Sequence, residues 1–280
     1  SVRQLSAHTV AAYRRDLRTL TQGIGEQDPT TVTAIDLHRL LAQRSQAKAT
    51  SIARQLAAWR AFYNFLISAD CMRINPVLAV VAPKRPAHLP KALTPDEMNS
   101  LLATPTDKND LLSVRDTAMM ELLYSSALRL AELTQLNIND IDQAGGFIYV
   151  QRGKGGRGRV VPLGKTAAAA LAVWLPQRQA LLAGVAEPAL FVGRNKTRLC
   201  GRSVQKRIDR HVKKIGFKQT VSPHMFRHSC ASHFLQSSGD LRATQELLGH
   251  RDISATQIYT RLDFQHLANI YDKAHPRAKK

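Results

Sequence analysis

The segment SPHMFRHSCASH, residues 222–233, places three histidines and one arginine within ten positions. His224 and His228 are four residues apart, a spacing that puts two zinc ligands on one helix face. However, Met225 stands where a metalloprotease needs a glutamate, and the segment contains no carboxylate to complete a metal site. A solvated polar face, or core histidines satisfied by hydrogen bonds, is a second interpretation.

A phosphate clamp is the third interpretation of the same segment. His224, Arg227 and His228 would share one helix face, and His224 would lie in the first turn, where the helix dipole favours an anion. The guanidinium group of Arg227 offers two parallel donors to phosphate oxygens, and a histidine can donate or accept a proton near neutral pH. The pattern HxxR alone is a weak signal, so the rest of the chain must decide.

Other residues that could act on a phosphate follow one another along the chain. ALRLAEL contains Arg129 and Glu132, RGKGGRG contains Lys154, LLGH contains His250 and TQIYT contains Tyr259. A tyrosine hydroxyl can attack phosphorus, arginines can stabilise the charge of the transition state, and a lysine can protonate the leaving oxygen. Taken singly, each has a plainer interpretation, such as a core tyrosine, a salt bridge to Glu132 or a DNA-backbone contact.

The order Arg, Lys, HxxR, His, Tyr resembles the tyrosine recombinases, also called the lambda-integrase family, over nearly the whole chain. The stretches RHSCASHFLQSSGDLRATQELLGHRDISATQIYT and LDFQHLANIYDKAHPRAK resemble the Xer subfamily. The first motif departs from the usual GLRxSEL, because Ala127 and Ala131 replace the glycine and the serine.

The resemblance implies that Tyr259 forms a 3′-phosphotyrosine with DNA, without a metal or other cofactor. The implied catalytic residues are Arg129, Lys154, His224, Arg227, His250 and Tyr259, and Glu132 is expected to orient an arginine or a histidine. Since a tyrosine has a pKa of about 10, it needs a proton acceptor. His224 is expected in that role and His250 on a phosphate oxygen, although the sequence leaves this division open.

The resemblance also implies partners. A Xer recombinase acts on a short site in double-stranded DNA, as a heterotetramer with an XerD-like paralogue, and resolves chromosome dimers under the control of the DNA translocase FtsK. An integrase of a phage or mobile element is a close alternative. A noncatalytic architectural DNA-binding protein is an alternative of another class, but it gives no reason for the six motif residues to occur together.

The charge of the chain agrees with a polyanionic partner. Forty Lys and Arg stand against 21 Asp and Glu among 280 residues, a net charge of +19, which indicates nucleic acid before an acidic membrane. Residues 1–90 hold 12 basic and 5 acidic residues, so both halves of the chain are expected to contact DNA.

Cysteine usage and hydropathy bound the setting of the protein. Cys71, Cys200 and Cys230 are far apart and form no CxxC motif, which favours a reduced, intracellular compartment. The longest apolar run, residues 166–176, is too short to span a bilayer. We expect a cytoplasmic protein.

The fold that must position these residues is predicted to be mainly α-helical. Residues 1–82 are expected to form a SAM-like core-binding bundle of about four helices, residues 83–92 a Pro-rich basic linker, and residues 93–280 the catalytic domain. Thr33 with Asp36 and Thr94 with Glu97 are predicted capping boxes. The two domains are expected to close around DNA as a C-shaped clamp.

In the catalytic domain one β-hairpin is predicted, with strands at residues 147–150 and 159–161 around a Gly-rich turn. Two helices are expected within residues 111–136, the second reading SSALRLAELTQL, and others open at Ser222-Pro223 and at Asp240. The last helix, residues 263–271, is expected to dock on a neighbouring protomer, so that truncation after Leu262 would spare single-site DNA binding.

Basic residues outside the catalytic set are predicted to contact DNA. They lie on the third helix, the linker, the hairpin turn and a basic amphipathic helix at residues 203–216: Arg54, Arg60, Lys84, Arg85, Arg152, Arg157, Arg159, Lys206, Arg207 and Arg210.

Overall fold

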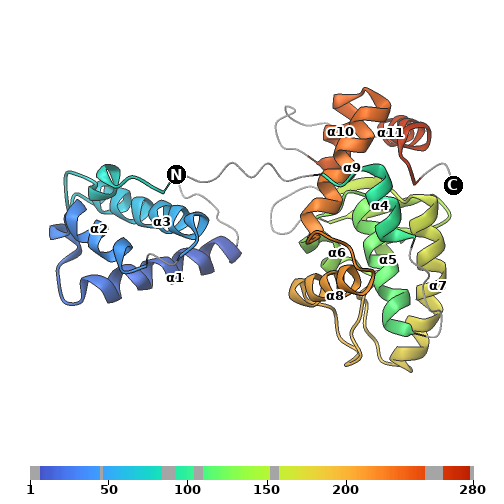
Figure 1. Ribbon diagram of the computed structural model, residues 1–280, viewed down its shortest axis with the longest axis horizontal. Helices are drawn as coiled ribbons and strands as arrows, with labels where there is room; N and C mark the ends of the chain where they lie inside the picture. Colours follow the sequence, from blue (N-terminus) through green and yellow to red (C-terminus); the bar gives the residue numbers. More distant parts are fainter. Residues whose placement is uncertain are drawn as a thin grey trace. The chain divides into compact units, whose positions relative to one another are not determined.

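The computed structural model describes residues 7–44, 47–83, 92–103, 110–151, 158–249 and 261–277, without the side chains of 7, 8, 261–266 and 269. The chain forms two compact units, Ser1–Leu89 and Pro90–Lys280, each with its own hydrophobic core (Figure 1). Most of the predicted linker, with Lys84 and Arg85, lies outside the described residues.

The N-terminal unit contains α1 (Ala7–Ile24), α2 (Ala34–Ala42) and α3 (Ala49–Ser68), with short 3-10 turns η1 (Pro29–Thr31) and η2 (Pro76–Ala79). About four helices were expected, whereas residues 7–44 and 47–83 hold three α-helices. The short turn η2 packs against α2 and α3. The predicted capping box at α2 is present. The hydroxyl of Thr33 accepts from the backbone N–H of Asp36, and the Asp36 carboxylate accepts from the N–H of Thr33 at 3.0 Å.

The core of this unit lies under the apolar face of α3, as its spacing predicts. Trp59 and Tyr63 are fully buried, and the indole Nε1 of Trp59 donates to the carbonyl of Asp16 at 2.8 Å. On α1 the predicted apolar stripe is only partly buried, since Leu20 lies in the core while Val10 is 42% exposed. The stripe therefore leaves apolar surface at the beginning of α1.

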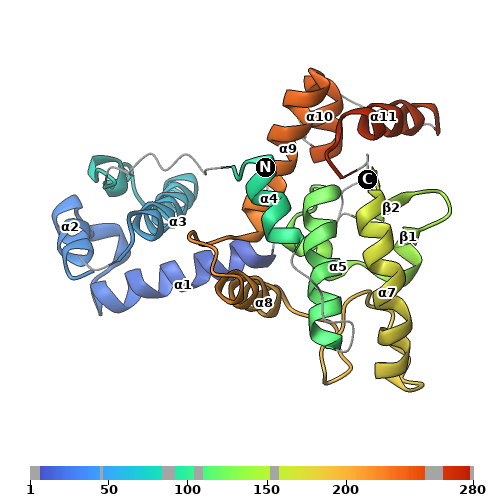
Figure 2. The same ribbon diagram turned by 45° about the vertical axis from the view of Figure 1, so that its right-hand side comes forward.

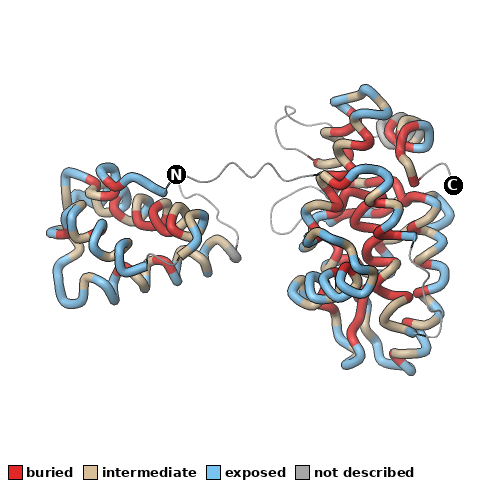
Figure 3. Tube along the Cα trace, viewed as in Figure 1, coloured by how far each residue is buried: buried red, intermediate tan, exposed pale blue. Residues whose placement is uncertain are grey.

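The C-terminal unit is built around α5 (Leu111–Ser125), which is buried along most of its length. It packs against α4 (Pro95–Leu102), α6 (Leu130–Gln135), α7 (Lys165–Leu182), α8 (Gly201–Lys214) and α9 (Pro223–Ser238). Figure 3 shows the buried residues concentrated along α5, while the outer faces of α7 and α8 are exposed. The remaining helices are α10 (Leu241–Leu248) and α11 (Arg261–Ala274).

A small antiparallel sheet stands beside these helices (Figure 2). The predicted hairpin is confirmed as β2 (Phe147–Val150) and β3 (Arg159–Pro162), with Val150 paired to Arg159. A third strand, β1 (Ile141–Asp142), pairs with β2. A strand of two residues is too short to show a pattern in the sequence. The fold class is therefore mainly α with a small sheet, as predicted. Among the described residues, the helices lack the combination of length and hydropathy that crossing a bilayer requires.

Helix ends follow local sequence signals in most places. Helix α9 begins after Ser222, and Gly239 and Gly249 end α9 and α10 with positive φ angles of 67° and 62°. One boundary differs from the prediction, because α6 begins only at Leu130. Ala127 takes a left-handed φ of 49°, a conformation that cannot continue a right-handed helix.

Helix α11 packs in its own unit, against α9, α10 and β3. Leu267 and Tyr271 are buried there, and the Tyr271 hydroxyl donates to the carbonyl of Ser125 at 2.9 Å. Truncation after Leu262 would therefore remove the core side chains of Leu267 and Tyr271, and its effect on single-site DNA binding stays a prediction. Exchange of this helix between protomers stays a prediction.

Candidate active site

Glu132 occupies the first turn of α6 because the chain enters this helix in an extended conformation at Arg129. The carboxylate accepts the backbone N–H of Arg129 at 2.7 Å, which satisfies a donor that the first turn of a helix leaves free. A negative side chain at this position is also stabilised by the helix dipole. The local sequence RLAE thus fixes Glu132 beside Arg129.

Three arginines from distant parts of the chain meet at the Glu132 carboxylate. Arg129 donates from Nη1 to Oε1 at 2.9 Å. Arg159, the first residue of β3, donates from Nη1 to Oε1 at 2.7 Å and from Nη2 to Oε2 at 3.0 Å. Arg227, on α9, places Nη1 at 3.9 Å from Oε2 as an ion pair. The structure thereby brings together Arg129, Glu132 and Arg227, all three of which the sequence predicted as site residues.

Arg227 is held by backbone carbonyls from two other segments. Its Nη1 donates to the carbonyl of Ala127, and its Nη2 donates to the carbonyl of Leu248 at 2.5 Å. These bonds join α9 to the loop before α6 and to the end of α10. The left-handed turn at Ala127 and the C-terminus of α10 are therefore parts of the site.

The electrostatics of the cluster favour an anion. Burial alone would raise the pKa of Glu132, but the hydrogen bonds and charges of Arg159, with those of Arg129, outweigh it and lower the pKa to about 2. Burial, followed by the positive charges of Arg129 and Arg159, lowers the pKa of Arg227 to about 10. At neutral pH three positive groups thus surround one negative group, and the excess positive charge attracts a phosphate.

Exposure divides the cluster into an open side and a closed side. The side chain of Arg129 is 46% exposed, whereas those of Arg159 and Arg227 are 3% and 7% exposed. His224 is exposed in the first turn of α9. His233 is buried instead, with Nδ1 at 2.9 Å from the Tyr124 hydroxyl and Nε2 at 2.8 Å from the carbonyl of Leu93.

Lys154, His250 and Tyr259 lie outside the described residues. Described neighbours of two of them do touch the cluster. Lys154 lies in the sequence between Val150 and Arg159, which pair in the sheet. Leu248, whose carbonyl holds Arg227, precedes His250 by two residues.

Three of the predicted DNA contacts are engaged within the chain. Arg159 is buried against Glu132, Arg54 pairs with the buried carboxylate of Asp16, and Arg207 pairs with that of Asp116. Each carboxylate lies far from its arginine in the sequence, so neighbouring residues give no sign of these ion pairs. Arg159 is too deeply buried for a surface contact, whereas Arg54 and Arg207 are 41% and 21% exposed, so their contact with DNA stays a prediction.

The other predicted contacts differ in exposure. Lys206 and Arg210 are exposed on α8, and Arg60 is half-buried on α3. Arg152 and Arg157 lie outside the described residues.

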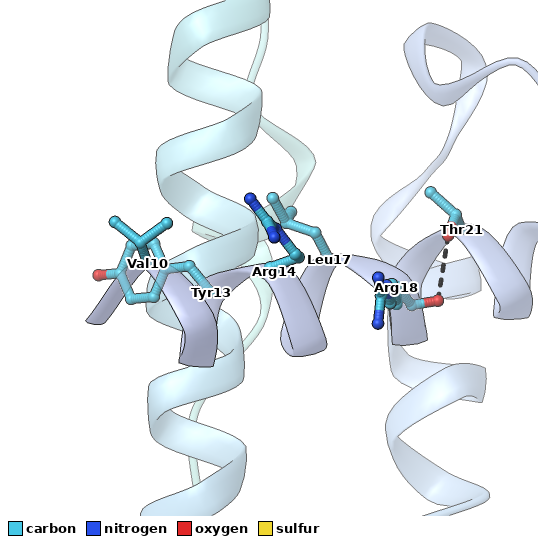
Figure 4. Close-up of a pocket in the computed structure, with 6 residues that line it drawn as sticks. All are labelled: Val10, Tyr13, Arg14, Leu17, Arg18 and Thr21. Atoms are coloured by element: carbon cyan, nitrogen blue, oxygen red, sulfur yellow. Dashed lines mark hydrogen bonds between the residues drawn. The ribbon is translucent and has the colours of Figure 1, made fainter. Parts of the chain in front are cut away.

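Sequence reasoning did not select the arginines of α1. Arg14 and Arg18 are exposed and line an open groove with Val10, Tyr13, Leu17 and Thr21 (Figure 4). The hydroxyl of Thr21 donates to the carbonyl of Arg18 at 3.0 Å. The spacing of the two arginines, four residues apart on a helix, was the available signal.

Metal ligands do not gather in the part of the chain that is described. No group of three or more His, Cys, Asp or Glu there could hold a metal ion. On α9 itself, Arg227 lies between His224 and His228 in the sequence.

Comparison with known proteins finds matches over most of the chain. Residues 91–266 match the phage integrase family, and residues 1–70 match the N-terminal SAM-like domain of phage integrases. The chain belongs to the phage integrase family. The recombinase is 48% identical over 277 residues to a protein of Chromobacterium violaceum named tyrosine recombinase XerC, covering 98% of this chain and 91% of that one. A protein of the same name from Alcanivorax borkumensis is 45% identical, over 100% and 92% of the two chains.

Solved structures of other recombinases share the fold. The crystal structure of XerA recombinase has a TM-score of 0.51 and 27% identity, covering 96% of this chain and 92% of that one. A lambda integrase dimer bound to a core site has a TM-score of 0.67 at 19% identity, covering 91% and 93%. The second likeness shows the fold alone. Together with the named relatives, the family identifies the chain as a DNA recombinase of the tyrosine type.

Proposed function

We propose that this recombinase cuts and rejoins DNA through a covalent bond between Tyr259 and a 3′-phosphate. The tyrosine oxygen bonds to phosphorus as the bond to the 5′-oxygen breaks, and the departing oxygen takes a proton. A 5′-hydroxyl from another strand then reverses the step, which conserves the energy of the phosphodiester bond. The observation that carries the proposal is the meeting of Arg129 and Arg227 at Glu132.

The proposed roles follow from the charges of the reacting atoms. Arg129, on the open side, and Arg227, on the closed side, hold the non-bridging oxygens as negative charge grows in the transition state. Lys154 protonates the departing 5′-oxygen. His224 and His250 share proton acceptance and a hydrogen bond to a phosphate oxygen, in a division that we leave open.

For the biological reaction we propose resolution of chromosome dimers at a short DNA site. The recombinase would act in a heterotetramer with an XerD-like paralogue and under the control of FtsK. Support comes from relatives named XerC over nearly the full length of the chain. We further propose that residues 1–82 and 93–280 are the core-binding and catalytic domains, and that they close on DNA as a clamp. Exposed Lys206 and Arg210, with Arg14 and Arg18 of α1, are candidate phosphate contacts.

A nicked DNA duplex tests the chemistry. A nick just 3′ of the scissile phosphate lets the short 5′-hydroxyl strand diffuse away, so the covalent adduct accumulates and is seen after denaturation in SDS. Tyr259→Phe should bind DNA normally and form no adduct, since only the attacking hydroxyl is lost. Tyr149→Phe is the matched control, because Tyr149 is an exposed tyrosine of β2, and it should form adduct at the wild-type rate. Wild-type adduct formation by Tyr259→Phe would assign the nucleophile to another residue.

A further inference from the structure

Arg159 is a buried arginine at the end of the turn that carries Lys154. Its side chain is 3% exposed, and its backbone pairs with Val150 in the sheet. Its guanidinium group makes two parallel hydrogen bonds to Glu132. This two-pronged geometry fixes the plane of the carboxylate as well as its position.

The fixed carboxylate in turn contacts both arginines to which the proposed function gives the phosphate. Oε1 receives Nη1 of Arg129 at 2.9 Å, and Oε2 lies 3.9 Å from Nη1 of Arg227. If the carboxylate turned about its last bond, both of these contacts would change. Two neighbouring guanidinium groups without the negative charge between them would also repel each other.

We propose that Arg159 is a positioning residue, which orients Glu132 so that Arg129 and Arg227 are held at the spacing that the scissile phosphate requires. This inference rests on the proposed function. Arg159 contacts no reacting atom in it and acts only through Glu132.

Stability alone gives a poorer account of this contact. A buried ion pair adds little stability compared with apolar side chains that fill the same space. Here Arg159 adds a positive charge beside Arg227, whose pKa is lowered first by its burial and then by the charges of Arg129 and Arg159. An exact orientation of Glu132 is what the two-pronged contact provides and an apolar pair could not.

The test uses Arg159→Lys in the full-length chain. Lysine keeps the positive charge but cannot make two parallel hydrogen bonds. We expect cleavage of saturating nicked DNA to slow by roughly 10²-fold, the effect of a misplacement of about 1 Å in a site. Affinity for DNA should be nearly unchanged, because Arg159 is buried away from the surface.

Arg178→Lys is the matched control for loss of a buried arginine. Arg178 is buried on α7 and donates to the carbonyls of Ala189 and Glu187, outside the cluster. This variant should cleave at close to the wild-type rate. If the two variants lost the same melting temperature and the same activity, Arg159 would have a general structural role and the proposal would be overturned.

A double variant identifies the route of the effect. If Arg159 acts through Glu132, Arg159→Lys combined with Glu132→Gln should cleave no more slowly than Glu132→Gln alone. Additive losses would mean that Arg159 acts elsewhere, and would sink the inference.

A substrate with sulfur in place of the bridging 5′-oxygen excludes the other route, through Lys154. Sulfur leaves without a proton, so it should not rescue Arg159→Lys. Rescue would show that Arg159 positions the Lys154 turn instead. Tyr259→Phe, assayed in parallel, separates failure of this inference from failure of the proposed function, which would appear as adduct formation by that variant.

Discussion

Each carboxylate oxygen of Glu132 accepts two hydrogen bonds, one from Arg129 and one from Arg159. This saturation keeps the carboxylate ionised, with a pKa near 2. Glu132 therefore carries its negative charge at neutral pH. In the proposed reaction Arg129 would turn from Glu132 towards a phosphate, while the two hydrogen bonds of Arg159 hold the carboxylate in place.

The role of Lys154 as general acid can be tested by changing the leaving group of the DNA substrate. Lys154→Ala should slow cleavage by roughly 10²–10⁴-fold, the range of general acid catalysis, while DNA binding changes little because other basic residues share the turn. Sulfur at the bridging 5′ position should restore cleavage to this variant, because a thiolate leaves without protonation. Single-turnover rates on the two substrates provide the measurement.

The two arginines are the comparison in that experiment. Sulfur should not restore Arg129→Ala or Arg227→Ala, whose task concerns the non-bridging oxygens. Equal rescue of all three variants, or no rescue of Lys154→Ala, would show that another group is the acid.

Local chemistry was predictable at the residue scale and long-range pairing was not. Arg129, Glu132 and Arg227 were found because each belongs to a short motif with a chemical purpose. The role of Arg159 was missed because its partner lies 27 residues away, and a basic residue beside a Gly-rich turn is ordinarily exposed. The same holds for Arg207, whose partner lies 91 residues away.

At the scale of elements, α9 connects the site to several distant segments. Arg227 reaches the carbonyls of Ala127 and Leu248, while Cys230 places its sulfur 3.5 Å from Nε2 of His275 near the end of the chain. Caps and glycine stops predicted the limits of α9 and α10 well, because such signals are local. The packing of α11 could not be predicted, because an apolar stripe does not tell whether its partner is the same chain or another.

The buried His275 should make the free energy of unfolding of the C-terminal unit depend on pH. Burial, followed by the charges of His233 and Arg277, lowers the pKa of His275 to about 3, below the value of about 6.5 for an exposed histidine. The unfolded chain thus binds a proton that the folded chain does not. Stability should fall as the pH drops from about 6.5 towards 3, by roughly 2 kcal/mol between pH 7.5 and 5.

The measurement is urea unfolding followed by tryptophan fluorescence. The chain has two tryptophans, so Trp59→Phe leaves Trp174 as the only fluorescent reporter of unfolding, and it lies in the C-terminal unit. In that background His275→Gln should show a smaller dependence on pH than the parent. His38→Gln, which changes an exposed histidine of α2, should retain the full dependence, and an equal slope in all three would contradict the assignment.

For the whole molecule, a net charge of +19 spread over both units predicts that both hold DNA. Residues 1–90 and 91–280, prepared separately, should each bind the site far more weakly than the full chain, since linkage raises the effective concentration of the second unit. The affinity of the full chain should fall more steeply with salt than that of either part, because more counterions are released. Gel-shift titrations at several salt concentrations measure both effects.

Equal affinity of one part and the full chain would refute the clamp. The relative arrangement of the units could not be derived from sequence, because charge and composition report that two parts bind and not how they face each other.

Leu93 has a mechanical consequence for such an arrangement. Its backbone N–H donates to the Ser229 hydroxyl at 2.9 Å, and its carbonyl lies 2.8 Å from Nε2 of His233. Both partners belong to α9, so the chain that arrives from the N-terminal unit is moored to the helix that carries Arg227. Leu93 lies before the first residue of α4, so these two bonds attach the chain to α9 ahead of α4. A force on the backbone at Leu93 would therefore reach α9, the helix that carries Arg227, through these two bonds.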